Sequence, residues 1–348
     1  MKNIFISYSR DEQKYVEEEI IPSIETIQGV KGHCWFDVND IESGAEFEQK
    51  IIDGIKECQI FLLMLTKSSQ VKPWPYKELK IAEEHLGGDS LRHVVLINLD
   101  NSEFVGHFKD YKEKKDIIFW EVSRQQQKLK NDIEKWIALI AGHYFNEALK
   151  LEEAYKSGED ANDFLKLLEK AAELEFSPAQ SKLAFYYKQS HNLEEAIRWC
   201  DRAIKNDNAS AFSLLGNIYK EKGDIGNTIA NFQESANHNW AYGQYKLGKI
   251  YNEGMYLKKD TISAIFWLKK SADQNHPDAQ KLLGDILVKD FKDHHELAID
   301  YYQKAKKNFT SLLEVSRDEK QINHAQNEIS KIIKALENLR SRQRTKRK

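Results

Sequence analysis

The second part of the sequence repeats itself, and this repetition constrains the fold more than any other feature. Five similar segments start at residues 146, 178, 210, 242 and 278, so successive copies are offset by 32, 32, 32 and 36 residues. The sixth position is leucine in every copy, the second is small in four copies, and the tenth is tyrosine in four. One pair of helices cannot bury its apolar face alone, so the repetition predicts helix pairs that stack into an all-α solenoid.

A second stretch with helical spacing of apolar residues follows each segment and is expected to complete its pair. These stretches cover residues 164–172, 196–204, 228–236, 264–272 and 298–306. We expect the array at residues 144–309, with one or two further helices at 310–339 that close its end or pair with another chain. The last nine residues, 340–348, hold six basic and no acidic side chains and are predicted to form a basic disordered tail.

The first part of the chain alternates short apolar runs with amphipathic stretches, which is a β-α-β-α pattern. The runs at residues 60–65 and 94–97 are apolar on both sides, as in parallel strands that helices cover on both faces. Five strands within about 140 residues favour an α/β flavodoxin-like domain with a five-stranded parallel sheet at residues 1–141. We expect strands at 4–8, 32–37, 59–66, 93–99 and 116–120, and helices at 12–27, 46–57, 75–86 and 123–141.

Ligands of such a sheet bind at the carboxyl ends of its strands. Residues 7–11, 37–44 and 66–74 follow the first three strands and should therefore surround one crevice.

Composition and charge exclude several classes of protein. The chain has 348 residues, a formal net charge of −3 and 41% hydrophobic residues, which indicates a globular two-domain protein. Three cysteines without metal-ligand spacing argue against a disulfide scaffold and a metal site, and favour the reducing cytoplasm. No segment has the length and hydrophobicity of an export signal or a membrane span, so no membrane partner is expected. Residues 1–339 hold 46 basic and 55 acidic side chains, so nucleic acid is not an expected partner.

Three blocks in the first 140 residues resemble a TIR domain. They are Ile4-Phe5-Ile6-Ser7-Tyr8-Ser9-Arg10-Asp11, then Cys34-Trp35-Phe36-Asp37 with Asp40-Ile41-Glu42-Ser43-Gly44, and then Thr66-Lys67-Ser68-Ser69 with Trp74-Pro75-Tyr76-Lys77-Glu78-Leu79. In the second part, the phrases that resemble Sel-one-like relatives of tetratricopeptide repeats are Trp267-Leu268-Lys269-Lys270-Ser271-Ala272 and Ala279-Gln280-Lys281-Leu282-Leu283-Gly284. The repeat resemblance implies a binding surface for a protein or another ligand, which it does not name.

The TIR resemblance implies an activity and a set of site residues. Enzymatic TIR domains cleave NAD+ with a glutamate in a Trp-x3-Glu block, which in this chain is Glu78. Nicotinamide leaves NAD+ as a neutral molecule, so one carboxylate that stabilises the cationic ribose suffices, and no cofactor is expected. The resemblance implies nucleotide contacts from Ser7, Tyr8, Arg10, Trp35, Phe36, Asp37 and Trp74, and contacts between protomers from the BB loop with Asp40, Ile41 and Gly44.

Each of these residues also has an ordinary structural explanation. A glutamate in the first turn of a helix that begins near Pro75 interacts favourably with the helix dipole, by about 0.3–1 kcal/mol. Residues 7–10 could cap the following helix, the aromatic residues could pack in the core, and Gly44 permits a turn with or without assembly. The dipeptide Trp74-Pro75 replaces the Trp-Cys common in the family, which leaves the shape of the pocket rim and the product open.

From these observations we hypothesise a cytoplasmic NAD+ nucleosidase that self-associates through its TIR domain under control of the repeats. The products would be nicotinamide and either ADP-ribose or a cyclic isomer, and the architecture resembles anti-phage defence effectors. Two alternatives stay open at this point. One is a scaffold without enzymatic activity, and the other is a virulence factor that mimics host TIR signalling.

Overall fold

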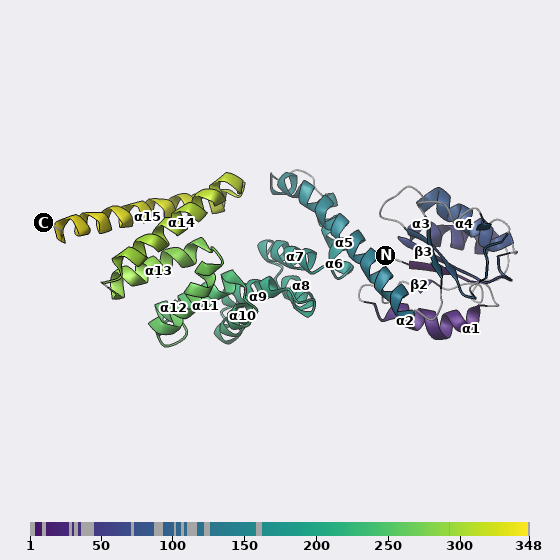
Figure 1. Ribbon diagram of the computed structural model, residues 1–348, viewed down its shortest axis with the longest axis horizontal. Coiled ribbons are helices and arrows are strands. Elements are labelled where there is room, and N and C mark those ends of the chain that lie inside the picture. Colours follow the sequence, from purple (N-terminus) through teal and green to yellow (C-terminus); the bar gives the residue numbers. More distant parts are fainter. Residues whose placement is uncertain are drawn as a thin grey trace. The chain divides into compact units, whose positions relative to one another are not determined.

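The computed structural model describes residues 4–8, 12–27, 30, 34–35, 45–70, 73–86, 93–100, 102–105, 108–109, 117–121, 126–157, 162–291 and 293–346. The chain forms two compact units, Met1–Ala179 and Gln180–Lys348. The first unit contains a parallel sheet with helices on both faces, and the described part of the second unit consists of paired helices (Figure 1).

Five parallel strands form the sheet of the first unit, as the sequence predicts. Their order is β2-β1-β3-β4-β5, so β3 is the central strand and lies between β1 and β4. In the register, Ile4 of β1 lies opposite Ile60 of β3, which lies opposite His93 of β4. The strands are β1 (Ile4–Ser7), β2 (Cys34–Trp35), β3 (Ile60–Leu65), β4 (His93–Asn98) and β5 (Ile117–Glu121).

Helices cover the sheet on both faces (Figure 1). The helical stretch expected at residues 12–27 contains a π-helical segment, η1 (Val16–Ile20), between α1 (Gln13–Tyr15) and α2 (Ile21–Glu25). The next three helices are α3 (Ala45–Glu57), α4 (Pro73–Leu86) and α5 (Gln126–Ser157).

Alternate residues of the strands enter two separate cores. Ile4, Ile6 and Tyr8 pack with side chains of η1, α2 and α5 on one face. Phe5 packs with α3 and α4 on the other face, together with Phe61 of β3. Because side chains of a strand point alternately to the two faces, Ser7 belongs to the α4 face and Tyr8 to the opposite one.

Helix α5 is longer than the sequence predicts. We expected a helix that ends near residue 141, but α5 continues without interruption to Ser157. Its first half packs in the sheet core through Ile133, Trp136 and Ile140. Its second half contacts α6 (Asn162–Glu173) as the first pair of the array. Leu174, which follows α6, also belongs to the sheet core, so the first helix pair is built onto the sheet.

The repeats form the helix pairs that their periodicity predicts. After α6 come α7 (Ser177–Gln189), α8 (Leu193–Lys205), α9 (Ala209–Glu221), α10 (Ile225–Asn237), α11 (Ala241–Glu253), α12 (Thr261–Asp273), α13 (Pro277–Asp290) and α14 (His295–Val315). The small residues of the pattern are buried where helices meet. At Gly284, a Cβ would lie 2.7 Å from the ring of Tyr302, which explains why only glycine fits there.

A last helix, α15 (Glu319–Lys346), covers the end of the array. Its apolar residues Ala325, Ile332, Leu336 and Leu339 pack against α14, which agrees with the expected capping helix. The basic segment that we expected to be disordered continues this helix as far as Lys346.

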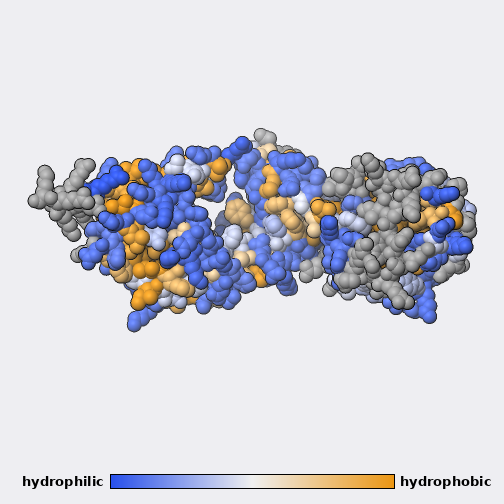
Figure 2. All heavy atoms as spheres, in the orientation of Figure 1, coloured by the Kyte–Doolittle hydropathy of each residue, from blue (hydrophilic) through white to orange (hydrophobic). Residues whose placement is uncertain are grey.

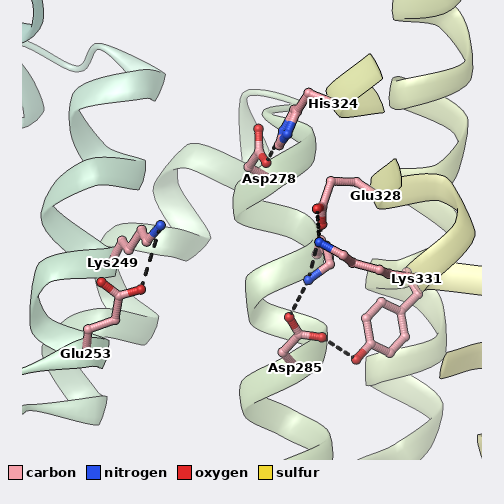
Figure 3. Close-up of polar contacts among 9 residues, drawn as sticks. Lys249, Glu253, Asp278, Asp285, His324, Glu328 and Lys331 are labelled. Carbon is pink, nitrogen blue, oxygen red and sulfur yellow. Dashed lines mark hydrogen bonds and ion pairs between the residues drawn. The ribbon is translucent and has the colours of Figure 1, made fainter. Parts of the chain in front are cut away.

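Ion pairs fasten α15 to α13 (Figure 3). Glu328 of α15 accepts from Lys281 of α13 at 3.4 Å and from Lys331 at 2.6 Å. Lys281 also reaches Asp285 at 2.7 Å, and Asp285 accepts the hydroxyl of Tyr302 at 2.7 Å. Glu328 itself is largely buried, and its two cationic partners compensate its charge.

Candidate active site at the sheet edge and a pocket in the repeats

A buried hydrogen bond joins two of the predicted site residues. Ser7 is the last residue of β1, and its hydroxyl donates to Oε2 of Glu78 over 2.6 Å. The exposed fractions are 4% for Ser7 and 3% for Glu78, so both side chains lie under the surface at the carboxyl edge of the sheet. The bond holds the carboxylate of Glu78 in one orientation at the place where ligands of parallel sheets bind.

The position of Glu78 in its helix argues against a mere dipole interaction. Helix α4 begins at Pro73, two residues earlier than expected, so Glu78 is its sixth residue and lies beyond the first turn. The influence of the dipole falls off within that turn. Leu79 and Ala82 of the same helix are fully buried in the core beneath it. The packing of α4 therefore directs Glu78 toward the end of β1.

The structure does not bring Tyr8 to the same place. Its side chain lies in the core on the opposite face of the sheet, and its hydroxyl donates to Oε1 of Glu17 at 3.0 Å. Trp35 pairs through its backbone with Phe5, and Trp74 lies in the first turn of α4, but their side chains are outside the described part of the chain. The other predicted residues outside the described residues are Arg10, Phe36, Asp37, Asp40, Ile41 and Gly44.

A second buried carboxylate at this edge was not predicted. Oε1 of Glu12, directly before α1, accepts the hydroxyl of Thr66, which directly follows β3. Thr66 is in turn bonded to Ser69, whose hydroxyl accepts the N–H of Thr66 at 2.8 Å. Glu12 and Thr66 are 54 residues apart, and only the pairing of β1 with β3 brings them together. The sequence alone contains no signal for this contact.

Hydrogen bonds also connect the segments that follow β3 and β4. The backbone N–H of Lys67 donates to Asp100 at 2.9 Å, and the N–H of Val105 donates to the side chain of Gln70 at 2.8 Å. Burial raises the pKa of Asp100, but the hydrogen bonds from Lys67 and Ser102 outweigh this effect and hold it below its usual value. These bonds connect residues 67–70, which follow β3, to the segment that follows β4.

The second unit contains a large pocket of about 1120 Å³. Its wall is formed by α7, α9, α11 and α13, which are the first helices of their pairs, and by the end of α14 and the start of α15. Apolar side chains, amides and ion pairs line it together, including Phe185, Tyr242, Asn308 and Val315. This volume slightly exceeds that of pockets for drug-sized ligands, so it can hold a short peptide or a comparable ligand.

Two contacts between histidine and carboxylate side chains lie in the wall of this pocket. Glu221 contacts Lys188 at 2.7 Å and His191 at 3.5 Å, and Asp278 contacts His324 of α15 at 2.9 Å (Figure 3). A neighbouring histidine, His276, is partly buried and accepts the N–H of Ala279 through Nδ1 at 3.4 Å. Burial lowers the pKa of His276, against the opposing effect of Asp278, so this side chain is neutral at pH 7.

Other chemical sites are not found in the described residues. Within them, no three His, Cys, Asp or Glu side chains are placed to hold a metal ion. Cys58 and Cys200 are buried free thiols, and burial raises the pKa of Cys200 to about 12, so this thiol is unreactive. None of the helices in this part of the chain has the length and apolar character needed to cross a bilayer.

Two protein families match the chain, each over one part. Residues 4–141 match the family described as TIR domain, and residues 177–208, 241–276 and 277–308 match the Sel1 repeat. The TIR match ends where the sequence predicted the end of the domain, although α5 continues beyond that point.

Curated relatives match about a third of the chain. The "Chitin synthase regulatory factor 3" of Schizosaccharomyces pombe is 25% identical over 136 residues, which is 35% of this chain and 15% of that protein. An uncharacterized protein of Neisseria meningitidis serogroup B is 26% identical over 129 residues, which is 36% of this chain and 27% of that protein. The chain therefore spans only a small share of the length of these relatives.

Solved structures resemble the repeats at low similarity. The Sel1 repeat protein of Oxalobacter formigenes is 19% identical with a TM-score of 0.41, covering 59% of this chain and 93% of that one. The protective antigen c5321 of uropathogenic Escherichia coli, which has an SLR fold, is 22% identical with a TM-score of 0.39. The match covers 64% of this chain and 51% of that one. From its sheet, its helix pairs and the two family matches, the chain combines a TIR domain at its N-terminal end with Sel1 repeats.

Proposed function

We propose that the TIR domain cleaves NAD+ with Glu78 as the catalytic carboxylate. The observation that carries this proposal is the buried bond from Ser7 to Glu78, which holds one carboxylate at the carboxyl end of β1, where ligands of parallel sheets generally bind. Cleavage of the bond between nicotinamide and ribose leaves positive charge on the sugar as the base departs. A carboxylate oriented in a water-poor site stabilises this charge electrostatically, without a general acid.

The repeats control this activity in our proposal. Self-association of TIR domains would bring the BB loop of one protomer to the site of another, and a signal bound by the repeats would permit this contact. The pocket that α15 helps to form is a suitable place for the signal, because its wall combines apolar, amide and charged groups. Activity that depends on association is expected of a toxic reaction, since unassembled chains stay inactive. A role in anti-phage defence is consistent with such an effector.

The test is to incubate the purified full-length protein with NAD+ and to separate the products by chromatography. We expect nicotinamide with ADP-ribose or a cyclic isomer from the native protein, and a loss of at least about 100-fold in Glu78→Ala, as for removal of one key electrostatic group. Glu84→Ala is the matched control, because Glu84 lies exposed on the same helix. It should retain full activity.

A different result would favour the alternative function. Robust cleavage by a folded Glu78→Ala protein would contradict the catalytic role of this residue. Unchanged NAD+ in concentrated samples of the native protein that do self-associate would instead indicate a scaffold, in which the TIR domain and the repeats only assemble partners.

A further inference from the structure

The pair formed by α11 and α12 differs from the other pairs in the loop between its helices. Seven residues, 254–260, separate α11 from α12, whereas three residues separate α7 from α8 and α9 from α10. The longer loop exposes two large apolar side chains, Met255 at 41% and Tyr256 at 39%, and also exposes Lys258 and Lys259. Insertions within a single repeat often lie on a binding face.

This loop has a defined conformation. Gly254 adopts a left-handed backbone with φ of 67°, and a Cβ there would lie 3.1 Å from Cβ of Lys259, so the loop folds back on itself. At its other end, the N–H of Asp260 donates to the carbonyl of Tyr251 at 3.0 Å. The carboxylate of Asp260 accepts the N–H groups of Ile262 and Ser263 and so caps α12. The exposed side chains are therefore presented by a fixed turn.

Helix α12 itself carries two large exposed apolar residues at positions where α8, α10 and α14 have charged or small residues. Ile262 is 82% exposed and Phe266, one turn later, is 51% exposed. The fully buried Ala264 aligns this helix with α8, α10 and α14 through Ala196, Thr228 and Ala298. The residues that correspond to Ile262 are Glu194, Gly226 and Glu296, and those that correspond to Phe266 are Arg198, Ala230 and Asp300. Packing within the array therefore does not require apolar side chains at these two positions.

Positive charge borders this surface. The ammonium of Lys270 lies 4.7 Å from the ring centre of Phe266 and 5.1 Å from that of Trp267. Lys258 and Lys259 are exposed on the adjoining loop. Figure 2 shows hydrophobic atoms gathered at the lower edge of the repeats, in the region of α12, with hydrophilic atoms around them. An apolar centre with lysines at its margin suits a partner that offers apolar side chains and carboxylates.

We propose that Met255, Tyr256, Ile262 and Phe266, with Lys258, Lys259 and Lys270, form a docking surface for an acidic amphipathic segment of another protein. We call this set the α12 surface. It is separate from the pocket described above, because no residue of α12 lines that pocket. An amphipathic helix binds through apolar residues one turn apart, which matches the spacing of Ile262 and Phe266.

The probe is a synthetic amphipathic peptide of about 18 residues, or about five helical turns, with leucines on one face and glutamates elsewhere. A second peptide has lysine in place of every glutamate. Fluorescence anisotropy with the full-length protein should show binding of the acidic peptide and at least about tenfold weaker binding of the basic one. The double variant Ile262→Glu with Phe266→Ala should bind the acidic peptide at least about tenfold more weakly. It should still fold, because α8, α10 and α14 carry such residues at these positions.

The matched control is Ile225→Glu, because Ile225 is an exposed apolar residue at the start of another second helix, α10, and lies outside the α12 surface. It should leave the affinity unchanged within about twofold. Equal binding of the two peptides, or undiminished binding by the double variant, would overturn the proposal. The proposal would also be overturned if the native protein bound phosphatidylserine vesicles and the double variant did not, because the occupant would then be a lipid surface. Dimers in sedimentation that the double variant abolishes would likewise overturn it, because the occupant would then be a second copy of the chain.

Discussion

Ser7 and Glu78 are the two residues on which the proposed chemistry depends. Both were predicted, but their hydrogen bond was not, because it requires the packing of α4 against the end of β1. The separation of Ser7 from Tyr8 could have been predicted, since consecutive residues of a strand face opposite ways. The contact of Glu12 with Thr66 could not, because it depends on which strands are neighbours.

Removal of the Ser7 hydroxyl tests whether it positions the carboxylate. We expect Ser7→Ala to lower kcat for NAD+ cleavage by about 10–100-fold with a smaller change in KM, since a misplaced catalytic group loses most of its effect. The free energy of unfolding should fall by about 1.5–3 kcal/mol, because Glu78 loses a buried donor. Steady-state kinetics and urea unfolding measure the two effects. An unchanged kcat in the folded variant would show that Glu78 needs no help from Ser7.

Among the elements, those with strong apolar patterns were predicted best. Strands β3 and β4 are fully or almost fully buried, as their continuous apolar runs predicted. The π-helical segment η1 was missed because apolar periodicity does not distinguish one helical hydrogen-bond pattern from another. The extent of α5 was missed because the motifs of the two domains meet within it, although no proline interrupts the helix between them.

Two glycines in helices should respond to alanine in opposite ways. Gly142 lies within α5, and an added Cβ would meet no atom within 4 Å, so Gly142→Ala should stabilise the protein by about 0.5–1 kcal/mol. At Gly248 of α11, the added Cβ would lie 2.7 Å from Leu268 and 3.2 Å from the carbonyl of Ala264. Gly248→Ala should therefore destabilise it by about 1–3 kcal/mol. Thermal unfolding of both variants checks this, and a lower midpoint for Gly142→Ala would indicate that α5 bends or breaks there.

The ion pairs of α15 should make the stability of the repeats depend on pH. Burial raises the pKa of Glu328, but Lys331 and Lys281 outweigh it and hold this pKa below its usual value of 4.5. The stabilisation by Glu328 is therefore complete above about pH 4.5 and is lost as the pH falls through the lowered value. Glu328→Gln should lower the thermal unfolding midpoint at pH 7, and the difference from the native protein should shrink as the pH falls below 4.5. Glu337→Gln, at an exposed position of α15, is the control and should show no such pH-dependent difference.

For the whole molecule, the first helix pair belongs with the sheet. Leu174 completes the core that β1, β3 and α5 form, and Phe176 packs against it. The family match ends at residue 141, but the physical unit extends to Ala179. Sequence motifs predicted the order of the two domains, whereas the place where one core ends depends on contacts that no motif records.

Two truncations test this boundary. A fragment of residues 1–176 should give a cooperative unfolding transition, because it retains α5, α6 and the core residue Leu174. A fragment of residues 1–143 should aggregate or melt at a clearly lower temperature, because it lacks the second half of α5, α6 and the core residue Leu174. Circular dichroism and size-exclusion chromatography distinguish the two. Equal stability of both fragments would show that the first helix pair contributes nothing to the sheet.

The shared helix α5 bears on how such chains can be exchanged in evolution. A gene fusion made at residue 141, where the TIR match ends, would cut through the continuous helix α5 and remove part of the core of the TIR domain. A crossover just before α7 would leave the core of the TIR domain intact and would also keep the remaining repeat pairs complete. Recombination that exchanges one repeat array for another should therefore keep the first helix pair with the TIR domain, and homologous fusions should diverge in sequence only after that pair.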